Sequence, residues 1–111
     1  MSVNRKRGEV EAVIDGAPRR LCLTLGALAE LEDAFAADDL GALVERFATG
    51  RLSARDMIRI IGAGLRGAGE TITDEGVAAL RVEGGAAGYA SIVSKLLTET
   101  FGSVQEQTQN P

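Results

Sequence analysis

The first part of the chain alternates between apolar and polar residues with the period of a β-strand. Two such runs lie between Gly8 and Leu25, and Asp15-Gly16 separates them, since a glycine accepts the positive φ of a tight turn. The inward-facing positions would be Val10, Ala12, Ile14, Leu21, Leu23 and Leu25. The pattern therefore predicts an N-terminal β-hairpin, whose free strand edge is an available pairing surface.

After the hairpin, apolar residues recur every three or four positions, which indicates helices. Thr24 is placed to cap a first helix that carries Phe35 and should stop near Ala37-Asp38. Gly50 stands where a second helix would end in a left-handed residue, and Ser53 with Asp56 resembles the capping box of a third. The three apolar stripes are Leu28, Leu31 and Phe35; Leu40, Leu43, Val44 and Phe47; and Met57, Ile60, Ile61 and Leu65.

Two glycines interrupt the third helix. Gly62 and Gly64 each cost about 1 kcal/mol relative to alanine, so we expect another backbone to pack closely there. Thr73 caps a short fourth helix, and a last helix is predicted from about Ala86 to Phe101. The stripe of the last helix contains Tyr89, Ile92, Val93, Leu96, Leu97 and Phe101.

These elements predict one α+β fold that is mostly α, with the hairpin packed on a bundle of about four to five short helices. A chain of 111 residues has room for one modest core. We expect residues 1–7 to be a flexible basic N-terminus, residues 8–101 a single domain, and residues 102–111 a flexible, extended or disordered polar tail.

Composition narrows the range of partners. The net charge of −4 makes nucleic acid an unexpected partner, because nucleic-acid binding usually needs a concentrated basic face. The one dense basic run, Arg5-Lys6-Arg7, is interpreted as a solvated tip. A contact with DNA or with an acidic protein surface is the alternative interpretation.

The sequence offers little catalytic chemistry. It contains no histidine, which removes the usual general base and zinc ligand, and its single cysteine, Cys22, cannot form an internal disulfide. The glycine-rich run at residues 62–69 follows an apolar helix rather than a strand and lacks a GK[ST] motif, so it is not expected to bind phosphate. We expect no enzymatic activity, no cofactor, no metal and no small-molecule substrate.

The chain has no apolar run near the roughly 20 residues that span a bilayer. Its first residues also lack the hydrophobic segment of a signal peptide. Cytoplasmic synthesis without membrane association is therefore expected.

The remaining signal favours an interaction module. A hairpin and several short helices bury only part of their apolar surface, so a partner helix or a second copy could cover the rest. The candidate partner-binding residues are Leu28, Leu31, Phe35, Ile92, Leu96, Leu97 and Phe101. Packing into the core is the alternative role for most of them.

Two segments carry a resemblance to a known family. The run LTLGALAELE at residues 23–32 and the run GAGLRGAG at residues 62–69 are the strongest, and Leu52-Ser53 with Asp56 lies between them. In order and spacing, residues 8–101 resemble the small tail proteins of alphaproteobacterial gene transfer agents (GTAs) and related tailed prophages.

This resemblance implies one of two roles. Family members are described as tail assembly chaperones or as tail tube-related proteins, and the mostly helical pattern favours the chaperone, because tube subunits are typically β-rich. Such a chaperone would bind the tape-measure protein, the tail tube protein or both during assembly in the bacterial cell. The alternative is a structural tail component, a tube, terminator or connector subunit, which would be associated with the virion.

Overall fold

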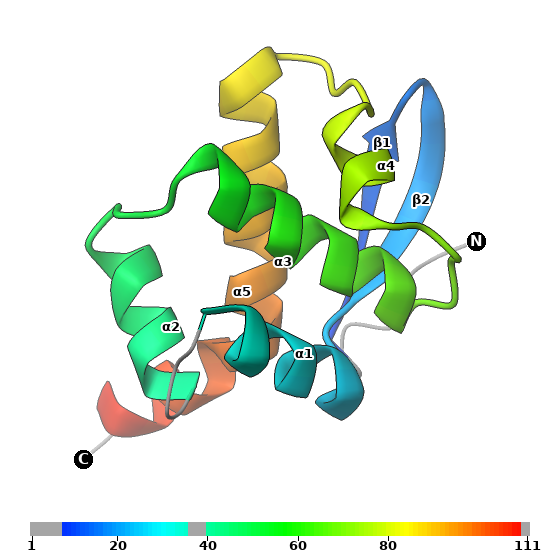
Figure 1. Cartoon of the computed structure of the whole chain (residues 1–111). Helices are drawn as coiled ribbons and strands as arrows, with labels where there is room; N and C mark the ends of the chain where they lie inside the picture. Colours follow the sequence, from blue (N-terminus) through cyan, green and yellow to red (C-terminus); the bar gives the residue numbers. More distant parts are fainter. Residues whose placement is uncertain (1–7, 36–39, 110–111) are drawn as a thin grey trace.

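A hairpin precedes a set of helices along the chain (Figure 1). The computed structural model describes residues 8–35 and 40–109, without the side chains of residues 40, 43, 47 and 103–109. Its elements are β1 (Glu9–Ile14), β2 (Ala17–Cys22), α1 (Leu25–Phe35), α2 (Leu40–Ala48), α3 (Ala54–Gly67), α4 (Asp74–Ala78) and α5 (Gly85–Gln109). The predicted α+β, mostly α fold with an N-terminal hairpin is confirmed.

The hairpin closes through a two-residue turn. Asp15 and Gly16 both have positive φ, 58° and 78°, and β1 pairs with β2 in antiparallel register. Val10, Ile14, Leu21 and Leu23 are buried as predicted, whereas Leu25 is 83% exposed. The prediction for Leu25 is wrong because β2 ends at Cys22 and Leu25 is already the first residue of α1.

Local side-chain caps begin three of the helices at the predicted residues. Thr24 Oγ1 accepts the Ala27 amide at 3.1 Å before α1, and Thr73 caps α4 in the same way. Before α3, Ser53 and Asp56 form both halves of a capping box. Each cap satisfies an amide that has no partner within its helix, so these boundaries follow from sequence near the boundary itself.

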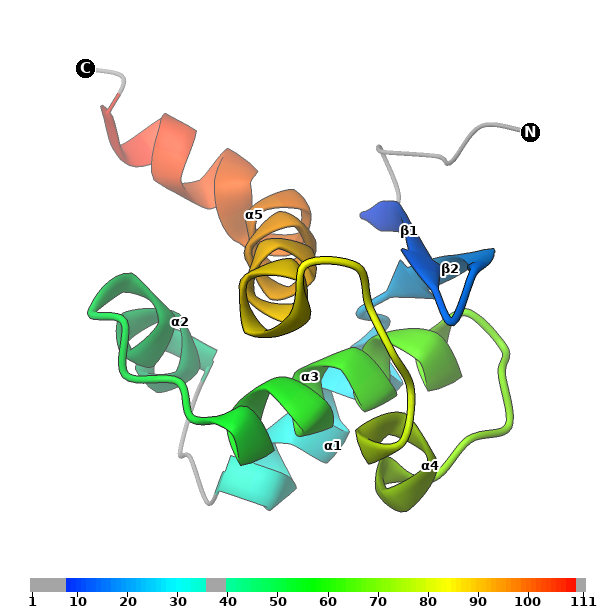
Figure 2. The ribbon, with the colours of Figure 1, turned by 90° about the horizontal axis from the view of Figure 1, so that it is seen from above.

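Helix α3 is the central element of the fold. It contacts β2, α1, α4 and α5, and every residue from Ile60 to Leu65 is buried. Seen from above (Figure 2), α3 runs beneath α5 with α1 and α4 on its other side, and the hairpin lies against its far end. Neighbouring elements surround this part of α3, and small residues let them approach the helix closely. The glycines of α3 are such residues.

Close packing at Gly62 and Gly64 is confirmed, but the predicted neighbouring backbone is not found there, because the nearest atoms at both glycines belong to side chains. A Cβ on Gly64 would lie 2.8 Å from Leu96 Cδ2, and a Cβ on Gly67 would lie 2.0 Å from the Cys22 carbonyl oxygen. The close neighbour is a backbone at Gly67, but at Gly62 and Gly64 it is chiefly side chains.

Helix α5 is longer than predicted. It continues through Gly102 to Gln109, so the predicted helix end near Phe101 is wrong and residues 102–109 are helical rather than extended. The expected flexibility of this tail stays a prediction. A single glycine costs only about 1 kcal/mol, and a helix already started in the core gains one hydrogen bond for each added residue. The expected flexibility of residues 1–7 and the inward positions of Leu40, Leu43 and Phe47 lie outside the described residues and side chains.

Candidate protein-interaction surfaces

The predicted partner-binding residues divide into two groups. Four are in the core, with exposed fractions of 7% or less: Leu31, Ile92, Leu96 and Leu97. Three are half-buried against the edge of that core: Leu28, Phe35 and Phe101. The first group is inaccessible to a partner in the folded chain. Partner binding by the second group stays a prediction.

An apolar groove opens between the start of α3, α4 and the start of α5. It has a volume of about 310 Å³. Ile61 and Val77, each 2% exposed, form its floor, and the half-buried side chains of Met57, Ile58 and Tyr89 form its sides. The sequence periodicity of α3 predicts its apolar face. It does not predict that the neighbouring helices leave part of this face uncovered.

Short side chains hold the groove open. Its rim carries Ala54, Ala78 and Ala86, all exposed, so no long side chain crosses the opening from these positions. The Tyr89 hydroxyl donates a hydrogen bond to the carbonyl of Leu80, which fixes the ring against the chain that leaves α4. The groove is therefore formed in the isolated chain, before any partner binds.

Charged side chains border the groove on one side. A neighbouring hollow of about 720 Å³ shares Ala54, Ile58 and Ala78 with it. This hollow adds two basic and two acidic side chains, Arg55, Arg59, Asp74 and Glu75. An apolar centre with a polar rim is typical of surfaces that bind other proteins.

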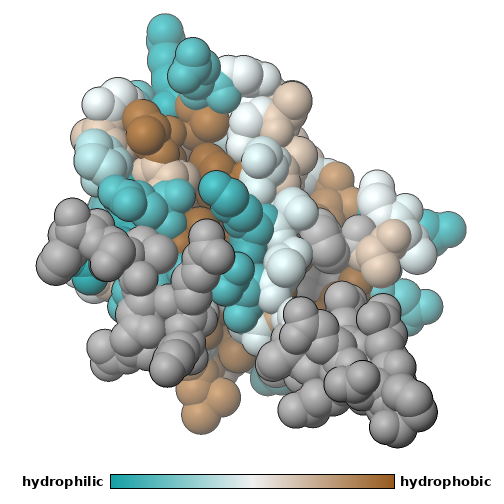
Figure 3. All heavy atoms as spheres, turned by 180° about the vertical axis from the view of Figure 1, so that it is seen from behind, coloured by the Kyte–Doolittle hydropathy of each residue, from teal (hydrophilic) through white to brown (hydrophobic). Residues whose placement is uncertain are grey.

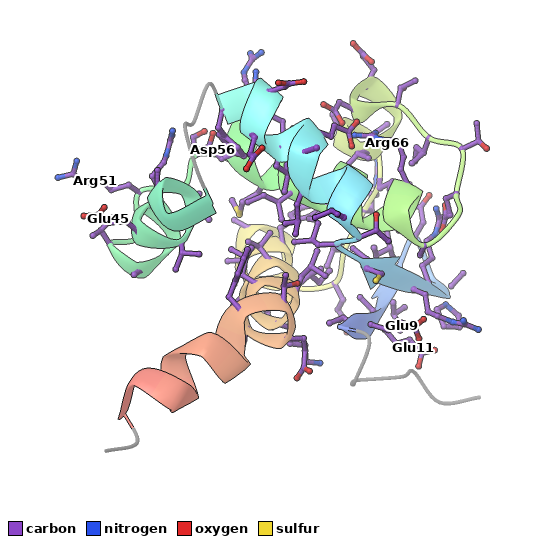
Figure 4. The ribbon with its side chains drawn as sticks, turned by 90° about the horizontal axis from the view of Figure 1, so that it is seen from below. Glu9, Glu11, Glu45, Arg51, Asp56 and Arg66 are labelled. Atoms are coloured by element: carbon purple, nitrogen blue, oxygen red, sulfur yellow. The ribbon has the colours of Figure 1, made fainter. Side chains whose placement is uncertain are left out.

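Phe35 marks the place where α2 joins the fold. The centre of its ring lies 5.3 Å from Arg46 Cζ and 5.8 Å from Arg59 Cζ, within the range of a cation–π contact for both. Arg46 also forms an ion pair of 3.0 Å with Asp56, which is only 5% exposed. Figure 4 shows Asp56 at the start of α3, beside α2. Phe35 is thus engaged by the chain's own arginines.

A second polar cluster fixes α4. Arg66 Nη2 lies 2.8 Å from a Glu30 oxygen and 3.2 Å from a carboxylate oxygen of Asp74, and Nη1 donates to the Ile72 carbonyl. These contacts join α3 to α1 and to the start of α4. Because α4 carries Val77, the cluster also positions one wall of the groove. Its charges pair with one another, and this arrangement is structural.

The described residues give no sign of a metal site. Among them, no group of three or more His, Cys, Asp or Glu side chains is placed to hold a metal ion. Cys22 is half-buried in β2.

None of the helices in residues 8–35 and 40–109 is long and apolar enough to cross a membrane.

Comparison with known families settles the family. A family model described as phage tail tube protein, GTA-gp10, matches residues 7–103. The chain belongs to this family. No curated protein and no solved structure matches the chain significantly. The predicted GTA and phage-tail resemblance is confirmed at this level, and the family description names a tube protein rather than a chaperone.

One face of this GTA-gp10 family member carries both apolar and polar surface among its described residues (Figure 3). Seen from behind (Figure 3), hydrophobic patches alternate with hydrophilic ones over the described atoms. Sequence reasoning identified the apolar stripes but missed the groove. The run of small residues at the start of α5, Gly84 to Gly88, was the one available signal of an uncovered wall.

Proposed function

We propose that this protein is a non-enzymatic structural component of a GTA or phage-type tail, serving as a tube, terminator or connector subunit. The observation that carries the proposal is the extent of the family match. It runs from residue 7 to residue 103 and so includes the hairpin, the groove and the core part of α5.

A subunit of this kind must contact more than one neighbour. Among the described residues, the apolar groove beside α3 offers one surface for such a contact. Its partners are other tail proteins, with the tail tube protein first among them. It is made in the cytoplasm of the producing bacterium and becomes part of the particle, without a cofactor or a small-molecule substrate.

Mass spectrometry of purified particles tests this proposal. We expect the protein in finished tails at a fixed ratio to the tube protein across gradient fractions. Presence in the cell lysate together with absence from finished particles would contradict a structural role.

A matched pair of variants tests whether the groove is used. Ile58→Asp places a charge on the half-buried side of the groove, whereas Leu25→Asp places the same charge on an exposed residue of α1. We expect only Ile58→Asp to reduce incorporation into particles. Equal incorporation of both variants would remove the groove from the proposed interface.

The tail assembly chaperone is the second candidate, and two observations favour it. The groove is apolar, preformed and walled by helices, which suits an amphipathic helix of a tape-measure protein. The described chain also has only one sheet of two strands, which is small for a tube wall. Co-expression with the tape-measure protein tests this role. A soluble complex that the Ile58→Asp variant does not form would support it, and an insoluble tape measure without a complex would exclude it.

A further inference from the structure

The two edges of the hairpin differ in how well they are protected. In β2, Pro18 has no amide hydrogen, and the Cys22 carbonyl faces Gly67 of α3 so closely that a Cβ there would lie 2.0 Å from it. Arg19 of β2 is held by Glu70 at 3.0 Å. A proline and a covering helix are the usual ways of blocking an edge strand. The β2 edge is therefore closed to another strand.

The outer edge of β1 is open along its middle. Successive residues of a strand point their backbone groups to alternate edges, and Ile14 pairs with Ala17 at the turn, so Glu11 and Val13 direct theirs outward. Among the described residues, no backbone hydrogen bond from outside the hairpin reaches these two. At the turn, the Asp15 amide donates to the Arg81 carbonyl at 2.7 Å.

Side chains on this strand are also accessible. Val13 is 58% exposed, which is unusual for a large apolar residue in this chain, and Glu11 is exposed beside it. Figure 4 shows Glu9 and Glu11 on the side of β1 that faces away from the helices. An added strand would thus meet an acidic stretch that ends in an exposed valine.

The residues on either side of Gly8 have opposite charges at matching distances. Arg7 and Glu9 lie one position from Gly8, and Arg5 and Glu11 lie three positions from it. When two copies of this segment pair antiparallel with Gly8 opposite Gly8, every Arg faces a Glu of the other copy. Opposite charges at facing positions stabilise a pair of strands, and like charges destabilise it.

The same register also covers the exposed valine. Val3 and Val13 are each five positions from Gly8, so Val3 of one copy lies opposite Val13 of the other. Val13 then gains an apolar neighbour at the end of the acidic stretch.

We propose that the open edge of β1 binds residues 3–7 of a second copy, and that the exchange is reciprocal, so that two chains form a two-fold dimer through one continuous sheet. A single chain cannot make the same pairing, because Gly8 alone would have to form the turn and the usual tight hairpin loop has two residues. Gly8 has a φ of 76°, and glycine changes readily to negative φ, which lets residues 3–7 align with β1. This dimer is independent of the proposed tail function.

Charge exchange tests the dimer. Sedimentation equilibrium of the full chain should show association that weakens with salt. Glu11→Arg and Arg5→Glu should each raise the dissociation constant by about tenfold or more, because each places like charges in two facing pairs. The double variant R5E/E11R should restore the wild-type value. Glu45→Arg, the same change on an exposed residue of α2, should have no effect.

Mixing the two single variants identifies the occupant. A mixture of E11R and R5E chains has complementary charges at every facing position, so we expect heterodimers where each variant alone is monomeric. A wild-type chain that is monomeric at its highest accessible concentration would overturn the proposal, and so would a mixture that stays monomeric. Circular dichroism of both single variants would show whether either change disturbs folding, and the variant that keeps the wild-type spectrum carries the test.

Discussion

The two halves of α3 lie in different environments although they form one uninterrupted helix. From Ile60 to Gly67 the helix runs through the core, with β2, α4 and α5 against it, and Gly64 and Gly67 leave no room for even a methyl group. From Ala54 to Ile58 it is covered on one side only, and Met57 and Ile58 line the open groove. Both halves are rich in apolar residues.

The difference shows that one helix supplies both closely packed core and partly exposed apolar surface. In the C-terminal half, small residues bring neighbouring elements to close contact, which maximises packing per residue. In the N-terminal half, larger apolar side chains stay partly exposed because the short α4 and the alanines of the rim do not cover them. The same apolar character therefore serves the core at one end and a surface at the other.

The core half should be intolerant of charge. Leu96 is 0% exposed and packs against Gly64, so Leu96→Asp buries a carboxylate without a partner and should unfold the chain. Circular dichroism with thermal melting measures this. Leu25→Asp, at an 83% exposed position, should change the free energy of unfolding by only about 0.5 kcal/mol or less. Comparable melting of the two variants would contradict the position assigned to α5.

Gly67 should be the most sensitive glycine of α3. Gly67→Ala would place a Cβ 2.0 Å from the Cys22 carbonyl oxygen, a backbone atom that cannot rotate away. We expect a loss of about 3 kcal/mol or more, at the upper end of overpacking effects. Urea unfolding gives the value. Gly26→Ala is the control, since its nearest neighbour would be 3.9 Å away, and it should leave stability unchanged or slightly raised.

The start of α3 should depend on its cap more than on its ion pair. Asp56→Ala removes both the acceptor of the Ser53 amide and the partner of Arg46, and should cost about 1–3 kcal/mol. Arg46→Ala should cost only about 0.2–1 kcal/mol, because its side chain is 44% exposed. Equal losses in urea unfolding would show that the ion pair, and not the cap, carries the stabilisation.

A small effect on folding is expected on the half-buried side of the groove. Ile58→Asp alters a half-buried side chain and should cost about 1 kcal/mol or less. Ile61→Asp, only one turn further along α3 and 2% exposed, should unfold the chain. Thermal melting of both variants locates the boundary between the two halves. Unfolding of the Ile58→Asp variant would show that the core extends to the start of the helix.

Much of the fold could be predicted from the sequence because its signals are local. The Asp15-Gly16 turn needs positive φ, and the caps at Thr24, Ser53 and Thr73 act within one helical turn. The end of α5 could not be placed in this way, since Gly102 resembles a helix end although the helix continues. Chain continuity there overrode the preference of one residue.

The candidate site was predicted less well. Leu31, Ile92, Leu96 and Leu97 belong to apolar stripes, but a stripe does not reveal whether another helix covers it, and here these residues are core. The groove depends on three elements that are far apart along the chain. No local pattern could place Met57 opposite Tyr89.

By itself the sequence determined the order of the elements, most of their starting points, the family resemblance and the absence of histidine chemistry, because each depends on neighbouring residues or on composition. Only the tertiary structure decided which apolar residues are buried, which face of α3 stays open and which edge of the hairpin is blocked. A residue is buried when elements from distant parts of the sequence pack against it. Those contacts depend on the packing of the whole chain, so no local pattern reveals them.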